Sequence, residues 1–220
     1  MSRGLFVTGT DTGVGKTIIS RGLITALKKS GLRVGAMKPI ETGGGSDGES
    51  LLAATGLPWS IDQVRPIALE LPAAPEVAAQ HQHRTIDLDA LERNFRERAA
   101  DCDFIVVEGA GGLMVPIAPR FTMAELAKRF ELPLLIVARS ALGTINHTLL
   151  TVEAARNRQL PIAGIVLSQT ARERGGEEDA TAAIIERHSG VPIFARIPFL
   201  DDVPPEKAAT FFDQALESLR

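Results

Sequence analysis

The 220-residue sequence predicts an α/β fold in which a mostly parallel, seven-stranded sheet carries helices on both faces. Two observations predict it. Short apolar runs rich in β-branched residues, each bounded by Gly, Pro or a polar residue, are typical of strands buried on both faces. Segments of helical periodicity lie between most of these runs, and an alternation of strands and helices favours parallel strands.

The apolar runs and the segments between them give the expected elements in order. The strands span residues 4–8, 33–37, 64–69, 104–108, 134–138, 162–167 and 193–197. The helices span about 16–30, 48–55, 87–100, 122–131, 145–158, 177–188 and 206–219. Between residues 66 and 75, three prolines exclude a regular helix.

Local signals mark several helix ends. Two pairs have the spacing of a capping box, Ser46 with Glu49 and Thr122 with Glu125. Two glycines, Gly31 and Gly190, stand where helices are expected to end, because glycine tolerates the left-handed conformation of a helix terminus.

Composition favours small molecules as partners. The 24 basic and 27 acidic side chains give a net charge of −3, which offers no broad positive surface for nucleic acid or an anionic membrane. No apolar run approaches the roughly 18 residues of a membrane helix, and Asp11 and Lys16 interrupt any signal peptide. We therefore expect a single cytoplasmic domain over residues 1–220. The only cysteine, Cys102, is predicted to be a packed thiol.

Residues 8–17 carry the strongest functional signal. Their sequence, Thr-Gly-Thr-Asp-Thr-Gly-Val-Gly-Lys-Thr, follows the first apolar run and leads directly into a helical segment. Glycines allow backbone N–H groups to close on phosphate oxygens, Lys16 can reach the outer phosphates, and the Thr17 hydroxyl can bind magnesium. Thr10 stands where a strict pattern has glycine. The loop predicts a P-loop NTPase-like fold that binds a nucleotide.

Other polar residues follow the ends of expected strands, where open α/β sheets bind their ligands. The segments are Lys38-Pro39 with Glu41-Thr42-Gly43, the run from Glu108 to Gly112, and Ser168-Gln169. Glu108 at such an end suits a magnesium ligand. Asp47, in a glycine-rich loop, is either a second metal ligand or a turn residue. Lys38 is either a second cation for phosphoryl transfer or a solvated lysine.

The remaining polar motifs are weaker. Residues 143–148 begin a long helix whose free N–H groups and positive dipole end could bind a carboxylate. His81 and His83 lack further partners with metal-ligand spacing and are predicted to be surface residues. His147 is predicted to be a satisfied or surface histidine, and His188 stands near a helix end, where it needs no function.

Together these motifs resemble those of the dethiobiotin synthetases. The resemblance rests on residues 8–17, Lys38-Pro39 with Thr42-Gly43, the run from Glu108 to Gly112, and the run from Leu142 to His147, and it spans nearly the whole chain. It implies an ATP- and Mg²⁺-dependent cyclo-ligase that joins CO₂ to 7,8-diaminononanoate, giving dethiobiotin, ADP and phosphate. One amine takes up CO₂ as a carbamate, the carbamate attacks the γ-phosphate, and the second amine closes the ring on the carbamic-phosphoric mixed anhydride.

The resemblance also implies roles for individual residues. Lys16 would hold the β- and γ-phosphates, Lys38 would stabilise the carbamate and the transferring phosphoryl group, and Thr42 would lie near the reacting nitrogen. The magnesium ligands would be Thr17, Asp47 and Glu108. The nucleotide would contact Thr12, Gly13, Val14, Gly15, Lys16, Thr17, Asp47, Glu108, Gly109, Ala110, Gly111, Ser168, Gln169, Ile197, Pro198 and Phe199. The substrate would contact Lys38, Thr42, Gly111, Thr144 and Asn146. The family is a homodimer in which the partner's helix start at 143–147 receives the substrate carboxylate.

Three positions depart from the family pattern. Gly13 stands where an acidic residue is usual. Ser168-Gln169 replaces an Asn-Asp-like pair that reads adenine, so the choice of nucleotide stays open. Ala74 and Glu76 stand where a family loop usually has a serine and a histidine, so the family's substrate contacts are not carried over to this loop and its role stays open.

Two other functions stay open from the sequence. A partitioning or localisation ATPase of the same fold group would act as a nucleotide-switched protein binder, but such proteins usually carry a lysine early in the loop, where this chain has Asp11. An ATP-dependent amide ligase would consume glutamine or ammonia in place of CO₂, although the chain has no room for a separate glutaminase domain.

Overall fold

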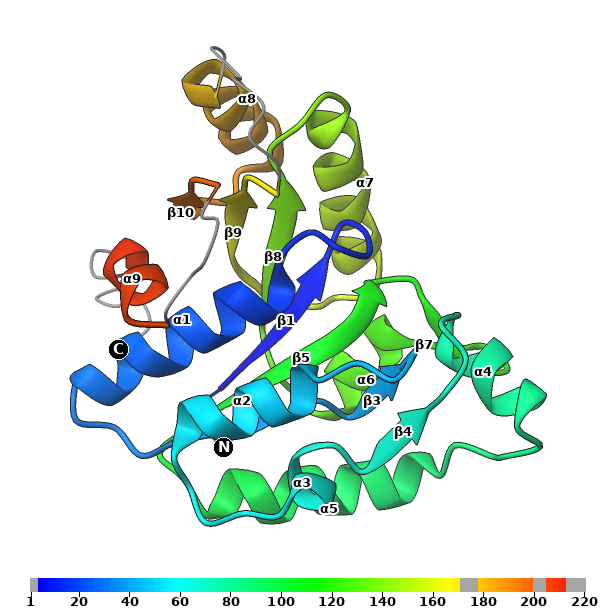
Figure 1. The fold of residues 1–220 in the computed structure, drawn as a ribbon. Helices are drawn as coiled ribbons and strands as arrows, with labels where there is room; N and C mark the ends of the chain where they lie inside the picture. The colour runs from blue at the N-terminus through cyan, green and yellow to red at the C-terminus, as the bar shows by residue number, and fades with distance from the viewer. Residues whose placement is uncertain (1–3, 171–177, 200–204, 213–220) are drawn as a thin grey trace.

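Six parallel strands form the central sheet (Figure 1). The computed structural model describes residues 4–170, 178–199 and 205–212. In spatial order the strands are β10 (Ile193–Ile197), β9 (Ile162–Ser168), β8 (Leu134–Arg139), β1 (Gly4–Gly9), β5 (Phe104–Gly112) and β2 (Val34–Met37). Each pairs in parallel with its neighbours. The predicted α/β fold is confirmed.

The prediction of a seventh strand in this sheet is wrong. Of the run 64–69, only β4 (Ile67–Leu69) is extended, and it pairs with β3 (Ile40–Thr42) in a separate two-stranded sheet. Residue 64 instead ends α3 (Ile61–Val64), which begins with a capping box between Ser60 and Gln63. Pro66 then offers no N–H to a strand ladder. A small antiparallel pair, β6 (Pro116–Ala118) and β7 (Phe121–Thr122), was not predicted either.

The helices follow the predicted segments closely. They are α1 (Lys16–Lys29), α2 (Asp47–Thr55), α5 (Leu88–Ala100), α6 (Met123–Arg129), α7 (Thr144–Asn157) and α8 (Glu178–Ser189). Two short helices were not predicted, α3 and α4 (Pro75–His81), the second of which begins at a proline. Of the segment 206–219, the structure describes α9 (Pro205–Ala209) and a 3₁₀ turn (Thr210–Phe212), and the prediction for 213–219 lies outside the described residues.

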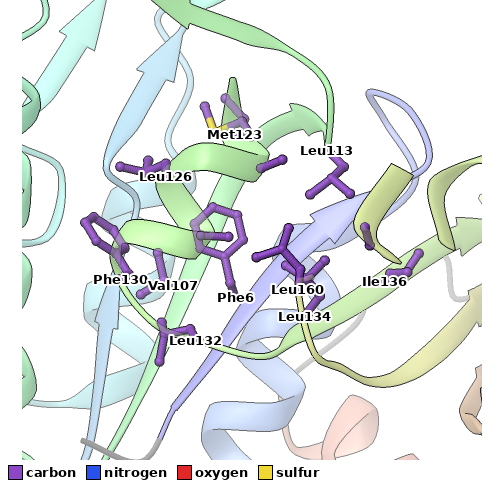
Figure 2. Packing of buried hydrophobic residues seen from close by; sticks show 14 of the residues in the cluster. Phe6, Val107, Leu113, Met123, Leu126, Phe130, Leu132, Leu134, Ile136 and Leu160 are labelled. Carbon is purple, nitrogen blue, oxygen red and sulfur yellow. The ribbon is translucent and has the colours of Figure 1, made fainter. Parts of the chain in front are cut away.

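Helices cover both faces of the sheet, and an apolar cluster fills each side. Side chains alternate between the faces along β1, so that Phe6 enters one cluster whereas Leu5 and Val7 enter the other. The Phe6 cluster receives side chains from α5 to α8, and Figure 2 shows part of it, with Phe130 of the α6 terminus near Phe6. The other cluster receives side chains from α1, α2 and the 210–212 turn. The strands are thus buried on both faces, as predicted.

Most of the local signals are confirmed. Thr122 and Glu125 form the predicted capping box, and Gly31 and Gly190 adopt φ of 89° and 62° after their helices. Ser46 makes no capping hydrogen bond through its side chain, so that prediction is wrong.

The predictions for the cysteine and the histidines also agree with the structure. The Cys102 thiol is half-buried, donates to the Arg98 carbonyl, and has its pKa raised by burial. The four histidines are exposed. Among the described residues, no helix has the length and apolar character to cross a membrane. The cytoplasmic location stays a prediction.

Candidate active site

The phosphate loop joins β1 to α1 at the carboxyl edge of the sheet. Gly13 and Gly15 adopt φ of 71° and 93°, in the left-handed region that favours glycine. A Cβ atom on Gly15 would also lie 2.8 Å from Oγ of Ser168, so a side chain at this position would have to displace that hydroxyl. The chain then enters α1, whose first N–H groups have no partner within the helix. Such groups are suited to phosphate oxygens.

Lys16 is the first residue of α1, and its side chain is buried beside the loop. Its Nζ donates to the backbone oxygen of Asp11 at 3.2 Å. Burial lowers the pKa of Lys16 to about 8; the charge of Glu108 opposes this fall, and that of Lys38 adds to it. A phosphate next to Lys16 would favour its charged form.

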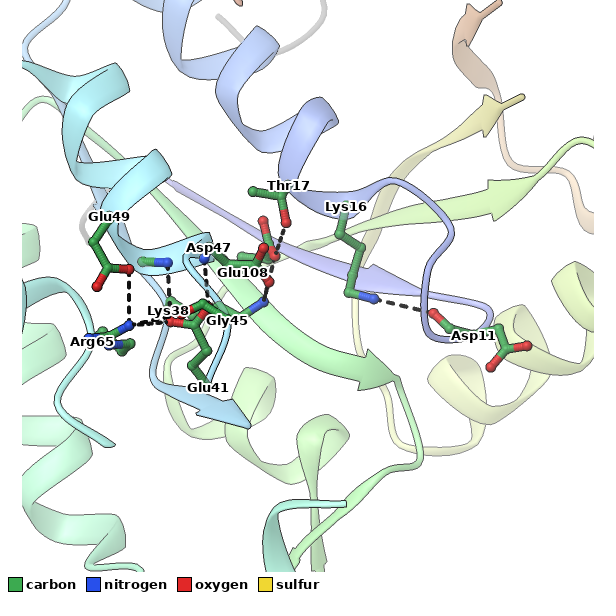
Figure 3. A network of polar contacts seen from close by, with 11 residues as sticks. Asp11, Lys16, Thr17, Lys38, Glu41, Gly45, Asp47, Glu49, Arg65 and Glu108 are labelled. Carbon is green, nitrogen blue, oxygen red and sulfur yellow. Dashed lines mark hydrogen bonds and ion pairs between the residues drawn. The ribbon is translucent and has the colours of Figure 1, made fainter. Parts of the chain in front are cut away.

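Lys38 follows β2 and is held between two carboxylates. Its Nζ lies 2.6 Å from Oε1 of Glu108 and 2.7 Å from Oδ2 of Asp47 (Figure 3). Burial favours the neutral amine, but the charges of Glu108 and Asp47 outweigh burial and raise the pKa of Lys38. Lys38 is therefore a buried cation, not a solvated lysine.

Glu108 lies within β5 and is fully buried. Its Oε1 accepts hydrogen bonds from Lys38 and from the Thr17 hydroxyl, the latter at 3.0 Å. Its Oε2 is also buried and has no hydrogen-bond partner among the described residues. A buried carboxylate oxygen without a partner is costly unless a ligand satisfies it.

The oxygen atoms at this position suit Mg²⁺. Thr17, Asp47 and the free oxygen of Glu108 are hard ligands of the kind that magnesium prefers. Burial tends to raise the pKa of Asp47, but the charge of Lys38 and the hydrogen bonds from Lys38 and Thr17 together keep that pKa below its usual value. Within the described ranges, no group of three or more His, Cys, Asp and Glu side chains could hold a metal alone. The set therefore fits an ion that completes its shell with phosphate oxygens and water.

A cavity of about 360 Å³ brings most of the predicted site residues together. Its lining includes eleven of them: Thr12, Gly13, Gly15, Lys16, Thr17, Lys38, Thr42, Asp47, Glu108, Ala110 and Gly111. Val14 instead packs in the apolar core, and Gly109 lies against Phe6, where a Cβ atom would approach the ring to 2.9 Å. Three segments that are far apart in the sequence, residues 12–18, 38–47 and 108–111, thus line one cavity.

The five remaining residues predicted to contact the nucleotide lie at the carboxyl ends of the neighbouring strands β9 and β10. The N–H of Gln169 donates to the oxygen of Ile197, and Oε1 of Gln169 accepts from the N–H of Phe199, both at 2.9 Å. Ser168 is buried and approaches Gly15. Pro198, between Ile197 and Phe199 in the sequence, is exposed. These residues do not line the 360 Å³ cavity.

The start of α7 lies outside that cavity. Thr144 is buried with an unpartnered hydroxyl oxygen among the described residues, whereas Asn146 is exposed. A neighbouring cavity of about 420 Å³ is lined by residues of α7, the phosphate loop and the β5–β6 segment, among them His147, Thr10 and Met114. Thr144 and Asn146 thus do not line the cavity that Lys38, Thr42 and Gly111 share.

One residue of the site was missed by sequence reasoning. Glu41 lines the cavity and is 3% exposed, and its carboxylate binds the backbone of the Asp47 loop. It was noted only as part of a strand end. No local signal distinguishes it, because its partners lie several residues along the chain at Asp47 and Gly48, and farther at Arg65.

Comparison with known proteins shows the family. Residues 3–207 match a family described as an AAA domain. An ATP-dependent dethiobiotin synthetase of Anaeromyxobacter dehalogenans (strain 2CP-C) is 44% identical over 205 residues, which are 91% of this chain and 92% of that protein. The chain belongs to the dethiobiotin synthetase family. The dethiobiotin synthetase of Bacillus subtilis (strain 168) is 38% identical over 93% of this chain and 90% of its own length.

Solved structures of other proteins share the fold. A ParA family ATPase from Chlorobium tepidum TLS has a TM-score of 0.58 and 17% identity, covering 97% of this chain and 91% of that one. Chloroplast FtsY from Physcomitrella patens has a TM-score of 0.56 and 16% identity, covering 100% of this chain and 65% of that one. At such identity the likeness confirms the P-loop NTPase-like fold alone. The structural likeness to a ParA family ATPase therefore does not support a partitioning function for this chain, whereas the dethiobiotin synthetases are similar to it in sequence.

Proposed function

We propose that this chain is a single-domain ligase that converts 7,8-diaminononanoate, CO₂ and ATP into dethiobiotin, ADP and phosphate. The observation that carries the proposal is one cavity, in a dethiobiotin synthetase family member, where Lys16, Lys38, Thr42 and Glu108 converge. Two cations beside a phosphate loop suit phosphoryl transfer, in which positioning and charge stabilisation provide most of the rate.

Each residue would act where it lies. Lys16 would bind the outer phosphates and Lys38 the carbamate and the transferring phosphoryl group. Thr42, on the cavity wall, would orient the reacting nitrogen. The carbamate oxygen forms a bond to the γ-phosphorus as ADP leaves; the second amine then attacks the carbonyl carbon and phosphate leaves as the ring closes.

Thr17, Asp47 and Glu108 would hold Mg²⁺, supported by the unpartnered buried oxygen of Glu108. The ion would neutralise phosphate charge during transfer. Lys38 contacts Oε1 of Glu108 and Oδ2 of Asp47, which leaves Oε2 of Glu108 for the ion.

We further propose that the chain acts as a homodimer and that Thr144 and Asn146 bind the substrate carboxylate in the partner's site. Three large apolar side chains near the α7 start support an interface: Leu142 is fully exposed, Leu150 is 56% exposed and Met114 is 44% exposed. Thr144 and Asn146 do not line the 360 Å³ cavity of their own chain, which agrees with a role across that interface.

The test is product formation by the purified protein. The protein should convert diamine, bicarbonate, Mg²⁺ and ATP to a product with the mass of dethiobiotin, and phosphate release should require both diamine and bicarbonate. A panel of nucleoside triphosphates would show the base preference of Ser168-Gln169. Lys38→Ala should keep nucleotide binding and lose turnover. Equal phosphate release with and without diamine would overturn the proposal, and incorporation of ammonia would indicate an amide ligase.

A further inference from the structure

The Glu41 carboxylate is the centre of a buried network that the proposed chemistry does not use. Its Oε1 accepts the N–H of Asp47 at 2.6 Å, and its Oε2 accepts the N–H of Gly48 at 3.3 Å. Arg65 Nη1 lies 2.8 Å from the same Oε2 (Figure 3). Both oxygens are engaged, so Glu41 is not free to bind a substrate amine.

Glu41 replaces the helix cap that the sequence predicted. The first N–H groups of α2 need acceptors, and Ser46 does not supply one through its side chain. Glu49, its expected capping partner, pairs instead with Arg65 at 2.9 Å. A carboxylate from β3 therefore caps α2, and its charge also suits the positive end of the helix dipole.

The loop between β3 and α2 is shaped around this pair. A Cβ atom on Gly45 would lie 2.8 Å from Oε1 of Glu41, and one on Gly48 would lie 2.9 Å from Cβ of Arg65. Arg65 also donates to the carbonyl of Gly45 at 3.4 Å. Glycines at these positions let the loop close tightly on Glu41 and Arg65.

We propose that Glu41 is a positioning residue that holds Asp47 where the metal–nucleotide complex requires it, with Arg65 fixing Glu41 in turn. Asp47 makes both contacts: its N–H binds Glu41, and its carboxylate lies 2.7 Å from Lys38. A displaced N–H displaces the carboxylate as well. This inference rests on the proposed role of Asp47 as a magnesium ligand.

The experiment compares Glu41→Ala, Glu41→Asp and Glu41→Gln with Glu49→Gln. The control removes the other carboxylate that pairs with Arg65 but leaves the Asp47 N–H bonded. Calorimetry measures ATP binding at several Mg²⁺ concentrations and without Mg²⁺, and turnover and the unfolding midpoint are recorded separately.

We expect Glu41→Ala and Glu41→Asp to raise the Mg²⁺ concentration for half-maximal ATP binding by about 10-fold to 100-fold, as for other residues that orient metal ligands. ATP binding without Mg²⁺ should stay within about 2-fold. The Glu41→Gln amide oxygen can still accept the Asp47 N–H, so its shift should be smaller than that of Glu41→Asp, which retains charge but cannot reach. If Glu41→Ala fails to fold, the inference is tested by whether Glu41→Asp shifts the Mg²⁺ dependence more than Glu41→Gln does.

Unchanged Mg²⁺ dependence in Glu41→Asp, or the same shift in Glu49→Gln, would overturn the inference and leave Glu41 a structural residue. The wild-type arm tests the proposed function separately. Wild-type protein that binds ATP without any Mg²⁺ dependence would refute the metal site itself. Wild-type protein that makes dethiobiotin while the Glu41 variants are unshifted would refute only the role of Glu41.

Discussion

Lys38 and Glu108 form a buried ion pair, with 2.6 Å between Nζ and Oε1 and at most 4% exposure of either side chain. The pair joins the carboxyl end of β2, which Lys38 follows, to the middle of β5, and these strands are neighbours in the sheet. Asp47 adds a second carboxylate to the same ammonium group. In the ligand-free protein, Lys38 thus neutralises the carboxylates that we propose as metal ligands.

The first prediction follows from this pairing. Lys38→Met removes the only side-chain cation within bonding distance of Glu108 and Asp47 among the described residues, and should destabilise the metal-free protein by about 3 kcal/mol, because a buried charge loses its partner. The same variant should bind Mg²⁺ or Mn²⁺ more tightly than wild type without nucleotide. Urea unfolding and metal calorimetry measure the two effects. Lys28→Met, on the surface, is the control, and metal binding no tighter than wild type would contradict the prediction.

Lys38 and Glu108 could be predicted because each directly follows a run of apolar residues, so a local pattern locates them, although β5 continues past Glu108 to Gly112. The phosphate loop has the same advantage, since its glycines and Lys16 are contiguous. The main strands and helices were likewise predictable from local periodicity. That Lys38, Glu108 and the phosphate loop meet at one cavity could be predicted because the carboxyl ends of parallel strands lie at the same edge of a sheet.

What could not be predicted depends on partners distant in the sequence. The run 64–69 is apolar enough for a strand, but its pairing with β3, outside the main sheet, is a tertiary choice. Ser46 and Glu49 have capping-box spacing, yet Glu41 accepts the N–H of Asp47 at the helix start and Glu49 pairs with Arg65. The spacing of two residues cannot reveal a third acceptor that approaches from another strand.

The second prediction concerns the pH dependence of ATP binding. Burial keeps the pKa of Lys16 at about 8 in the ligand-free protein, and bound phosphates should raise it. Above pH 8, binding must then recharge Lys16, so affinity should fall by up to about 10-fold per pH unit until the pKa of the complex is reached. Below pH 8, Lys16 is already charged and the ATP affinity should change little through this residue.

Calorimetry of ATP binding at about pH 7.5 and about pH 9, on either side of the pKa of Lys16, in buffers of different ionisation enthalpy measures this uptake of protons. Lys16→Arg is the control, because a guanidinium stays charged throughout the range. An ATP affinity in wild type that is constant from pH 8 to 9, or that increases, would refute the assignment of Lys16 as the titrating group.

The third prediction separates two glycines of the phosphate loop. Both have positive φ, but a Cβ atom at Gly15 would lie 2.8 Å from Oγ of Ser168, whereas one at Gly13 would meet no atom of the described residues within 4 Å. Gly15→Ala should therefore weaken ATP binding at least about 10-fold, since it adds a clash to backbone strain of about 1 kcal/mol. Gly13→Ala, the matched variant, should change ATP affinity much less. Fluorescent nucleotide titration measures both, and equal affinities would contradict the argument.

The last prediction tests the proposed dimer. Leu142, fully exposed before α7, should be buried by the partner, so Leu142→Asp should place a charge in an apolar interface and shift the protein toward monomer in sedimentation. The KM for the diamine should rise more than that for ATP, because Thr144 and Asn146 would serve the partner's substrate. Val77→Asp, 49% exposed on α4, controls for surface charge. A wild-type protein that is monomeric at assay concentration and still turns over would show that the site is complete in one chain. A Leu142→Asp protein that remains dimeric with unchanged KM would show that Leu142 does not lie in the interface.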